Sequence, residues 1–125
     1  MKRFVTAVLL GVLGLYTVSS AHAVGDPKHG TDIFAEECAD CHSVLQDKNK
    51  KGPSLWGVAG RPSGAIADFD YSSAMRQSGI VWTADKMDAY ITQPKQVVAG
   101  TRMKYDGLGD AKARADLIAY LTSLH

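Results

Sequence analysis

The sequence has little net charge, which limits the partners to consider. Its 14 Lys and Arg residues nearly balance 13 Asp and Glu residues, for a formal net charge of +1. The basic stripe or patch that binds nucleic acid is missing. Internal repeats and low-complexity tracts are missing too, and 46% hydrophobic with 22% charged residues indicates one small globular domain.

A long apolar run is also missing. Residues 4–18 fall short of the roughly 20 apolar residues that a bilayer-spanning helix needs, and they include two glycines. Two basic residues precede this run and small residues follow it, an order typical of a cleaved export signal. We therefore expect residues 1–23 to be a signal peptide, removed after Ala23, rather than a permanent membrane anchor. Residues 24–125 would be the mature domain.

Strand-like alternation is absent, whereas caps and helical periodicity predict helices. The first should cover residues 27–41, the second residues 84–92 and the third residues 111–124. A short, weaker helix is expected at residues 72–77. The residues expected to cap the three main helices are Asp26, Thr83 and Asp110.

Two stretches, residues 43–69 and 100–109, have no regular periodicity. Loops of this length are uncommon in a compact domain unless they have a function or something to wrap. A domain of about 100 residues buries only about 60–65% of its unfolded surface, and short helices make a thin core. The sequence therefore predicts an all-α fold of three main helices plus a short one, with long loops wrapped around a bound group.

Cysteine is scarce. The only two thiols, Cys38 and Cys41, lie in the stretch CADCH, and Cys41 directly precedes His42. A disulfide over so short a loop would constrain little of the unfolded chain and leaves His42 unexplained. A zinc site usually has four protein ligands, and a thioredoxin-like pair belongs in a βαβ pattern. Covalent haem attachment uses both thiols for the porphyrin vinyl groups and the imidazole for the iron. An export signal agrees with this use, since haem is attached outside the cytoplasm.

The iron of such a haem has a second axial position. His29 lies on the same predicted helix as His42 and cannot reach the opposite face of the ring. Met75 and Met87 lie in predicted helices, where methionine more often fills a core. Met103 lies in the loop GTRMKYDG, where an irregular backbone can aim a thioether inward. We therefore expect Met103 to be the second ligand.

Five stretches in order are GTDIFAEECADCH, KGPSLWGVAGR, FDYSSAMRQSGIVWT, YITQPKQVVAGTRMKYDGL and RADLIAYL. Together they make residues 25–124 resemble a class I cytochrome c of the small soluble bacterial type, similar to the mitochondrial protein. The resemblance implies the small cytochrome c fold. It also implies that Gly30 and Phe34 pack against Leu117 and Tyr120 where the first and last helices cross.

The resemblance assigns the haem contacts residue by residue. Cys38 and Cys41 would hold one haem c with its iron, and His42 and Met103 would be the axial ligands. Pro53 would offer its carbonyl to the far nitrogen of His42, which fixes the tautomer of a ligating imidazole.

Further residues would support the haem from the surrounding loops. Arg61, Tyr71 and Trp82 would bond or neutralise a buried haem propionate, because an unpaired carboxylate in a small core is costly. Tyr90 would place its hydroxyl near the methionine sulfur, and Thr101 would brace the same loop. For Arg61 and the three aromatic residues, a packing or surface role is the alternative.

The activity implied by the resemblance is one-electron transfer by a periplasmic monomer, not catalysis. Its partners would be redox proteins such as a cytochrome bc complex, a terminal oxidase of a respiratory chain or a periplasmic dehydrogenase, without nucleic acid and without stable membrane insertion after signal cleavage. A haem enzyme or gas-binding protein with an open sixth iron position is one alternative. A haem-free periplasmic dithiol or metal module is another.

Two departures from the family pattern concern the water region beneath the haem and the docking surface. Met75 stands where the family often has asparagine, which removes a polar partner. Glu36 and Glu37 stand where lysine would be usual, so the cationic ring around the haem edge is thinner and should give less salt dependence. The basic positions that do match are Lys50, Lys51, Lys95, Arg102 and Lys104.

Overall fold

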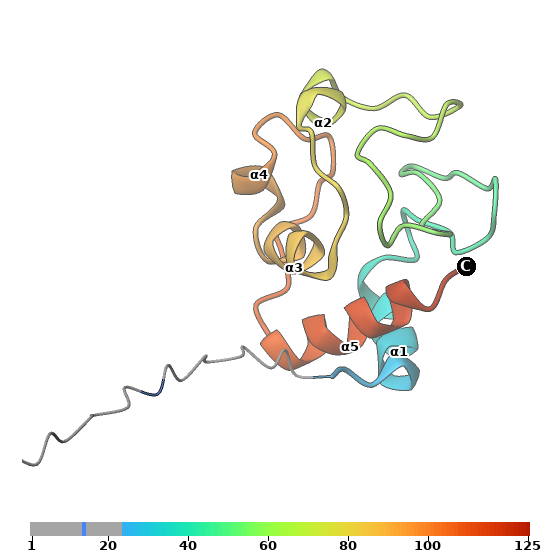
Figure 1. Cartoon of the computed structure of the whole chain (residues 1–125). Helices are drawn as coiled ribbons and strands as arrows, with labels where there is room; N and C mark the ends of the chain where they lie inside the picture. The colour runs from blue at the N-terminus through green and yellow to red at the C-terminus, as the bar shows by residue number, and fades with distance from the viewer. Residues whose placement is uncertain (1–13, 15–23) are drawn as a thin grey trace, which may run out of the picture.

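A computed structural model describes residue 14 and residues 24–125 of the chain. The expected signal peptide, residues 1–23, lies outside the described residues except for that one position. The described part is helical, with one isolated bridge between Pro62 and Val81 in place of any strand, which confirms the predicted all-α class. Its helices are α1 (Pro27–Glu37), α2 (Ser73–Gln77), α3 (Ala84–Thr92), α4 (Pro94–Val97) and α5 (Ala111–Thr122) (Figure 1).

The predicted capping residues begin the three longer helices. The Asp26 carboxylate accepts a hydrogen bond from the Lys28 amide at 2.9 Å, and the Asp110 carboxylate accepts from the Lys112 amide at the same distance. The Thr83 hydroxyl caps α3. Each cap satisfies an amide that has no partner within its own helix, so local sequence determines where these helices start.

The ends of the helices depart from the sequence prediction in two places. α1 ends at Glu37 rather than near Cys41, because the backbone at Cys38 leaves the helical region with φ −122° and ψ −28°. The chain also forms α4 directly after α3. Gln93 takes an extended conformation, with φ −149° and ψ 79°, and Pro94 then begins a new turn of helix. Proline favours the first turn of a helix because it lacks an amide hydrogen, so it ends one helix here and starts the next.

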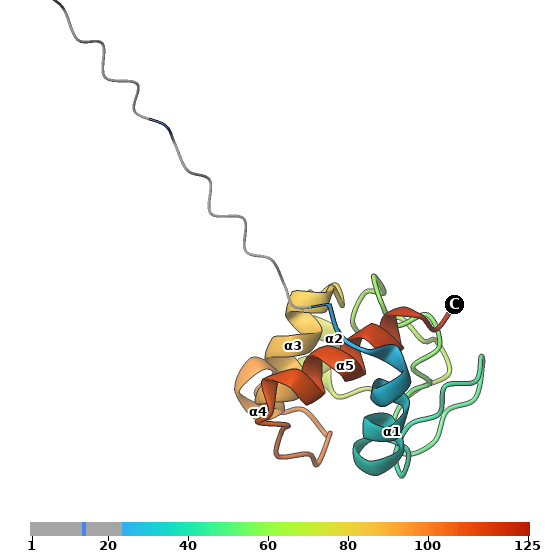
Figure 2. The same ribbon diagram turned by 90° about the horizontal axis from the view of Figure 1, so that it is seen from below.

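The predicted crossing of α1 and α5 is confirmed (Figure 2). Gly30 lies so close to α5 that an added Cβ would stand 2.0 Å from the Asp116 carbonyl oxygen and 2.8 Å from the Tyr120 Cβ. The rings of Phe34 and Tyr120 meet edge to face with centroids 5.8 Å apart. Leu117 faces this contact with no exposed surface. The crossing therefore depends on glycine, because only a residue without a side chain allows the two backbones to approach so closely.

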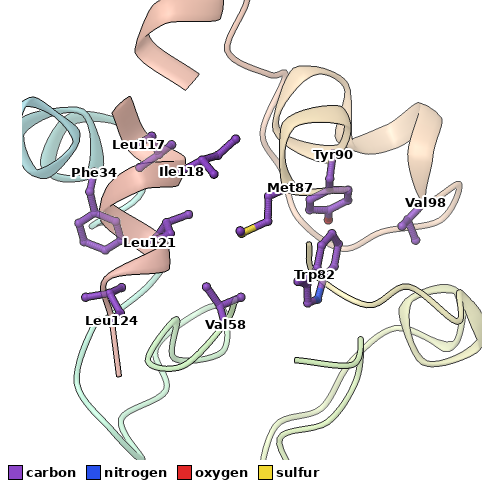
Figure 3. Close-up of a cluster of buried hydrophobic side chains, with 10 residues drawn as sticks. All are labelled: Phe34, Val58, Trp82, Met87, Tyr90, Val98, Leu117, Ile118, Leu121 and Leu124. Carbon is purple, nitrogen blue, oxygen red and sulfur yellow. The ribbon is translucent and has the colours of Figure 1, made fainter. Parts of the chain in front are cut away.

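The core joins this helix pair to the α3 side of the domain (Figure 3). The rings of Trp82 and Tyr90 contact each other at a tilt of 53° with centroids 5.0 Å apart on the α3 side, and Met87 extends from α3 towards α5. The buried apolar residues are Phe34, Val58, Trp82, Met87, Tyr90, Val98, Leu117, Ile118, Leu121 and Leu124. Met87 thus fills the core, as its place in a predicted helix indicated.

The predicted loop at residues 43–69 contains no helix, and backbone hydrogen bonds fasten its second half to the domain. The Gly57 amide donates to the carbonyl of Leu124 at 2.7 Å, and the Gly60 amide donates to the carbonyl of Trp82 at 2.9 Å. The Trp82 amide returns a bond of 3.0 Å to the carbonyl of Arg61. These bonds give Arg61 and Trp82 fixed positions relative to each other.

Candidate functional site

The two cysteines lie in a tight turn that follows α1. The amides of Cys41 and His42 both donate to the carbonyl of Cys38, at 3.1 and 2.9 Å. Both thiols are free, with Cys38 half-buried and Cys41 exposed. Burial, with the nearby Glu37 charge, raises the pKa of Cys38 to about 12, so its thiol stays protonated at neutral pH. A reactive redox pair needs a thiolate, so Cys38 is unsuited to be the attacking thiol of the dithiol alternative.

The imidazole of His42 is held in one tautomer. Its Nδ1 lies 2.7 Å from the carbonyl oxygen of Pro53, which can only accept a hydrogen bond, so Nδ1 carries the proton. Burial lowers the pKa of His42 more than this hydrogen bond raises it, which keeps the ring neutral at neutral pH. Within the described part of the chain, Nε2 makes no hydrogen bond. Its lone pair is therefore available, as a metal-ligating imidazole requires.

Gly52 makes room for this ring. An added Cβ at residue 52 would stand 2.4 Å from His42 Cε1 and 2.8 Å from Nδ1, far inside normal contact distance. The Gly52 amide also donates to the carbonyl of Cys41 at 2.8 Å, which ties the loop to the cysteine turn. Sequence analysis did not single out Gly52, although its position directly before Pro53 was a usable signal.

Met103 is half-buried and packs against the core, in the loop predicted to aim it inward. Its amide donates to the Thr101 hydroxyl oxygen at 3.3 Å, and the Tyr90 hydroxyl lies 2.8 Å from the same oxygen. The link from Tyr90 to Met103 therefore runs through Thr101. The expected bracing by Thr101 has a physical basis here, since its hydroxyl joins α3 to the loop of residues 100–109, called the methionine loop below.

Arg61 is a half-buried cation, and among the residues that the structure describes it has no anionic partner. Its Nη1 donates to the carbonyl of Trp56 at 3.1 Å, and none of its contacts in the described structure is to a carboxylate. Burial lowers the pKa of Arg61, which is the effect of desolvating a charge that lacks a counter-ion. A cavity of about 220 Å³ adjoins its side chain. An anion placed there would relieve the cost of burying this charge.

Two aromatic residues lie near the same region. The Tyr71 hydroxyl accepts a hydrogen bond from the Ile66 amide at 3.3 Å, and Tyr71 is close enough to act electrostatically on Arg61. Trp82 is buried, and its amide bonds the carbonyl of Arg61 as described above. With Arg61, these residues offer a cation and hydroxyl and indole donors, which is the chemistry that a haem propionate needs. The residues present therefore fit a haem at both its iron and its carboxylate edge.

A buried carboxylate marks the crossing of α1 and α5, and sequence analysis missed it. Asp116 has 1% of its surface exposed and accepts hydrogen bonds from the Asp26 amide, His29 Nδ1 and Lys112 Nζ, each at 2.7 Å. These bonds hold the pKa of Asp116 well below its ordinary value, and the bond from His29 contributes most. His29 thus bonds α5, in agreement with the expectation that it does not serve as an iron ligand. The signal in the sequence was a lone acidic residue inside an apolar helix face.

Two further features of the described residues bear on the alternatives. Among the described residues, no group of three or more His, Cys, Asp or Glu side chains could hold a metal ion. Nor does any helix of residues 24–125 have the length and apolar character needed to cross a bilayer. Short helices, long loops and an oriented imidazole beside two thiols together define a c-type haem protein.

Comparisons with known proteins agree with this class. The family model for cytochrome c matches residues 27–125. Cytochrome c2 of Rhodopila globiformis is 48% identical over 100 residues, which cover 80% of this chain and 94% of that protein. Cytochrome c of Gibberella zeae is 45% identical over 100 residues (79% and 94%), and cytochrome c 2.1 of Caenorhabditis briggsae is 43% identical over 97 residues (78% and 87%). The chain belongs to the cytochrome c family. It is accordingly an electron carrier rather than an enzyme, and it binds one covalent haem c with its iron.

Proposed function

We propose that this protein is a periplasmic one-electron carrier whose haem is attached through Cys38 and Cys41 and ligated by His42 and Met103. Residues 1–23 direct export and are then removed. The observation that carries the ligand assignment is the geometry of His42, whose Nδ1 is fixed by Pro53 while Nε2 stays available beside the two thiols.

The haem supplies an iron that changes between two oxidation states, and the protein keeps its surroundings constant. Pro53 holds the imidazole in one orientation through the 2.7 Å hydrogen bond. Thr101 holds the methionine loop against α3, so that Met103 as well as His42 would keep its position when the iron changes oxidation state. A thioether favours the reduced ion, which together with burial raises the reduction potential. Arg61, which is half-buried, would offset the negative charge of a haem propionate.

Electron exchange takes place with redox proteins during brief docking at the haem edge, as is usual for small redox interfaces. The cations expected around this edge are partly neutralised by the protein itself. Lys95 pairs with Asp106 and Arg102 pairs with Asp70, each at 3.0 Å. Lys104 forms no ion pair in the described structure. We therefore expect only weak electrostatic steering by a monomeric carrier towards its cytochrome bc complex, oxidase or dehydrogenase partners.

Replacing Met103 with Ala tests the ligand assignment. The oxidised variant should lose the absorption and magnetic signature of sulfur ligation, its reduction potential should fall, and the reduced form should bind carbon monoxide readily. Met75→Leu and Met87→Leu are matched controls, because each removes another candidate sulfur, and both should keep the wild-type spectrum. Wild-type-like behaviour of Met103→Ala would overturn the assignment.

Mass spectrometry of the exported protein tests attachment and cleavage together. We expect the mass of residues 24–125 plus one haem, stable to acid and organic extraction. A mass equal to the polypeptide alone, from cells able to mature haem proteins, would refute covalent attachment.

A further inference from the structure

The methionine loop is joined to α1 by a single side-chain bond in the described structure. The Tyr105 hydroxyl donates to a carboxylate oxygen of Glu37, across 68 positions of sequence. Glu37 is the last residue of α1 and directly precedes Cys38. Tyr105 lies two residues after Met103. The bond thus connects the cysteine side of the site to the methionine side.

The other hydrogen bonds of this loop lead elsewhere. Thr101 bonds Tyr90 in α3, Arg102 bonds Asp70, and the Leu108 amide bonds the carbonyl of Ile91. The Thr101 and Leu108 contacts fix both ends of the loop to α3, and the Arg102 contact ties it to the segment before α2. In Figure 2 the chain that follows α4 extends towards the C-terminal end of α1, where the Tyr105 bond is the one side-chain hydrogen bond between them among the described residues.

The chemistry of this bond makes it stronger than an ordinary surface contact. A phenol donating to an ionised carboxylate forms a charge-assisted hydrogen bond. Tyr105 is half-buried, so its ring is already partly ordered before the bond forms. Glu37 is exposed, but its backbone is fixed at the end of a helix that packs closely on α5. The Tyr105 ring and the Glu37 backbone are therefore already placed when the bond forms, and the ordering cost falls mainly on the Glu37 side chain.

We propose that Tyr105 and Glu37 are positioning residues that form a latch, which holds the middle of the methionine loop closed over the haem edge and slows departure of the Met103 thioether. The inference rests on the proposed ligation by Met103. It assigns a role to Glu37, an acidic residue at a position where the family usually has lysine. Glutamate at residue 37 accepts the hydrogen bond from Tyr105, and it lacks the positive charge with which a lysine would contribute to docking.

Cyanide binding to the oxidised protein tests the latch, because an external ligand can bind only after Met103 has left its position. Tyr105→Phe keeps the ring and removes the hydroxyl, so the rate constant for cyanide binding should rise about three- to tenfold. Glu37→Gln keeps an acceptor oxygen and should have a smaller effect. Glu36→Gln removes the same charge from the neighbouring exposed residue and should leave the rate unchanged.

A double variant separates the latch from general loosening of the loop. Because Tyr105 and Glu37 act through one bond, Tyr105→Phe with Glu37→Gln should bind cyanide no faster than Tyr105→Phe alone. A rate for Tyr105→Phe within twofold of wild type, with sulfur ligation intact by spectroscopy, would overturn the latch alone. Equal, fast cyanide binding by wild type and Met103→Ala would overturn ligation by Met103, and the latch with it.

Discussion

Replacing Gly30 with Ala should destabilise the protein, although the same change favours an isolated helix. Alanine is about 1 kcal/mol better than glycine in a helix interior. Here the added methyl group would stand 2.0 Å from the Asp116 carbonyl oxygen and 2.8 Å from the Tyr120 Cβ. Normal carbon contacts begin near about 3.5 Å, so α1 and α5 would have to separate by roughly 1.5 Å.

The cost of that separation should exceed the gain in helix propensity. Overpacking a close contact costs about 1–3 kcal/mol, and the upper end applies because neither contacting atom can move by rotating a side chain. We therefore expect Gly30→Ala to lower the free energy of unfolding by about 2 kcal/mol. Guanidinium unfolding of the oxidised, haem-loaded protein measures this, provided that the denaturant slope is unchanged.

Gly109→Ala is the matched control, because an added Cβ at that exposed position meets nothing within 4 Å. Its free energy of unfolding should stay within about 0.5 kcal/mol of wild type. If Gly30→Ala were as stable as wild type or more stable, the close approach of α1 and α5 would be wrong.

Two further predictions concern buried charges. The pKa of Asp116 is depressed in the folded state, so its contribution to stability is present above about pH 4 and is lost as the pH falls below that value. Urea unfolding between pH 5 and pH 3 should therefore show a smaller loss of stability for Asp116→Asn than for wild type, and equal losses would contradict the network. Arg61→Gln removes a cation beside the proposed propionate, so redox titration should give a lower reduction potential that depends more steeply on pH between pH 5 and pH 8. An unchanged potential and slope would argue for a packing role of Arg61.

The helix starts were predictable because their determinants are local. Asp26, Thr83 and Asp110 each cap a helix through an amide two or three residues away. The end of α1 was not predictable in the same way, because Cys38 still donates to the carbonyl of Phe34 while its own backbone leaves the helix. The apolar periodicity of the sequence continues past Glu37. The helix ends there because the chain forms the turn from Cys38 to His42.

The contacts of the site also differ in how far they could be predicted from the sequence. The motif around Cys38 and His42 could be interpreted from its own spacing, and the contact between His42 and Pro53 was implied by the resemblance to the cytochrome c family. The bond from Tyr105 to Glu37 and the bonds from Asp26 and His29 to Asp116 join residues far apart in sequence. None of these pairs leaves a spacing signal, since the partners come together only when the helices and the methionine loop are placed in space.

The way the described chain enters the domain has a practical consequence. Gly25 lies against the Ala115 carbonyl of α5, whereas Val24, one residue earlier, is fully exposed. A peptide tag, a fluorescent label or a surface tether attached at Val24 therefore needs to displace no side chain of the domain. Immobilising the carrier on an electrode by that residue should leave its electron exchange intact, while the same attachment at Gly25 would disturb the seam between its terminal helices.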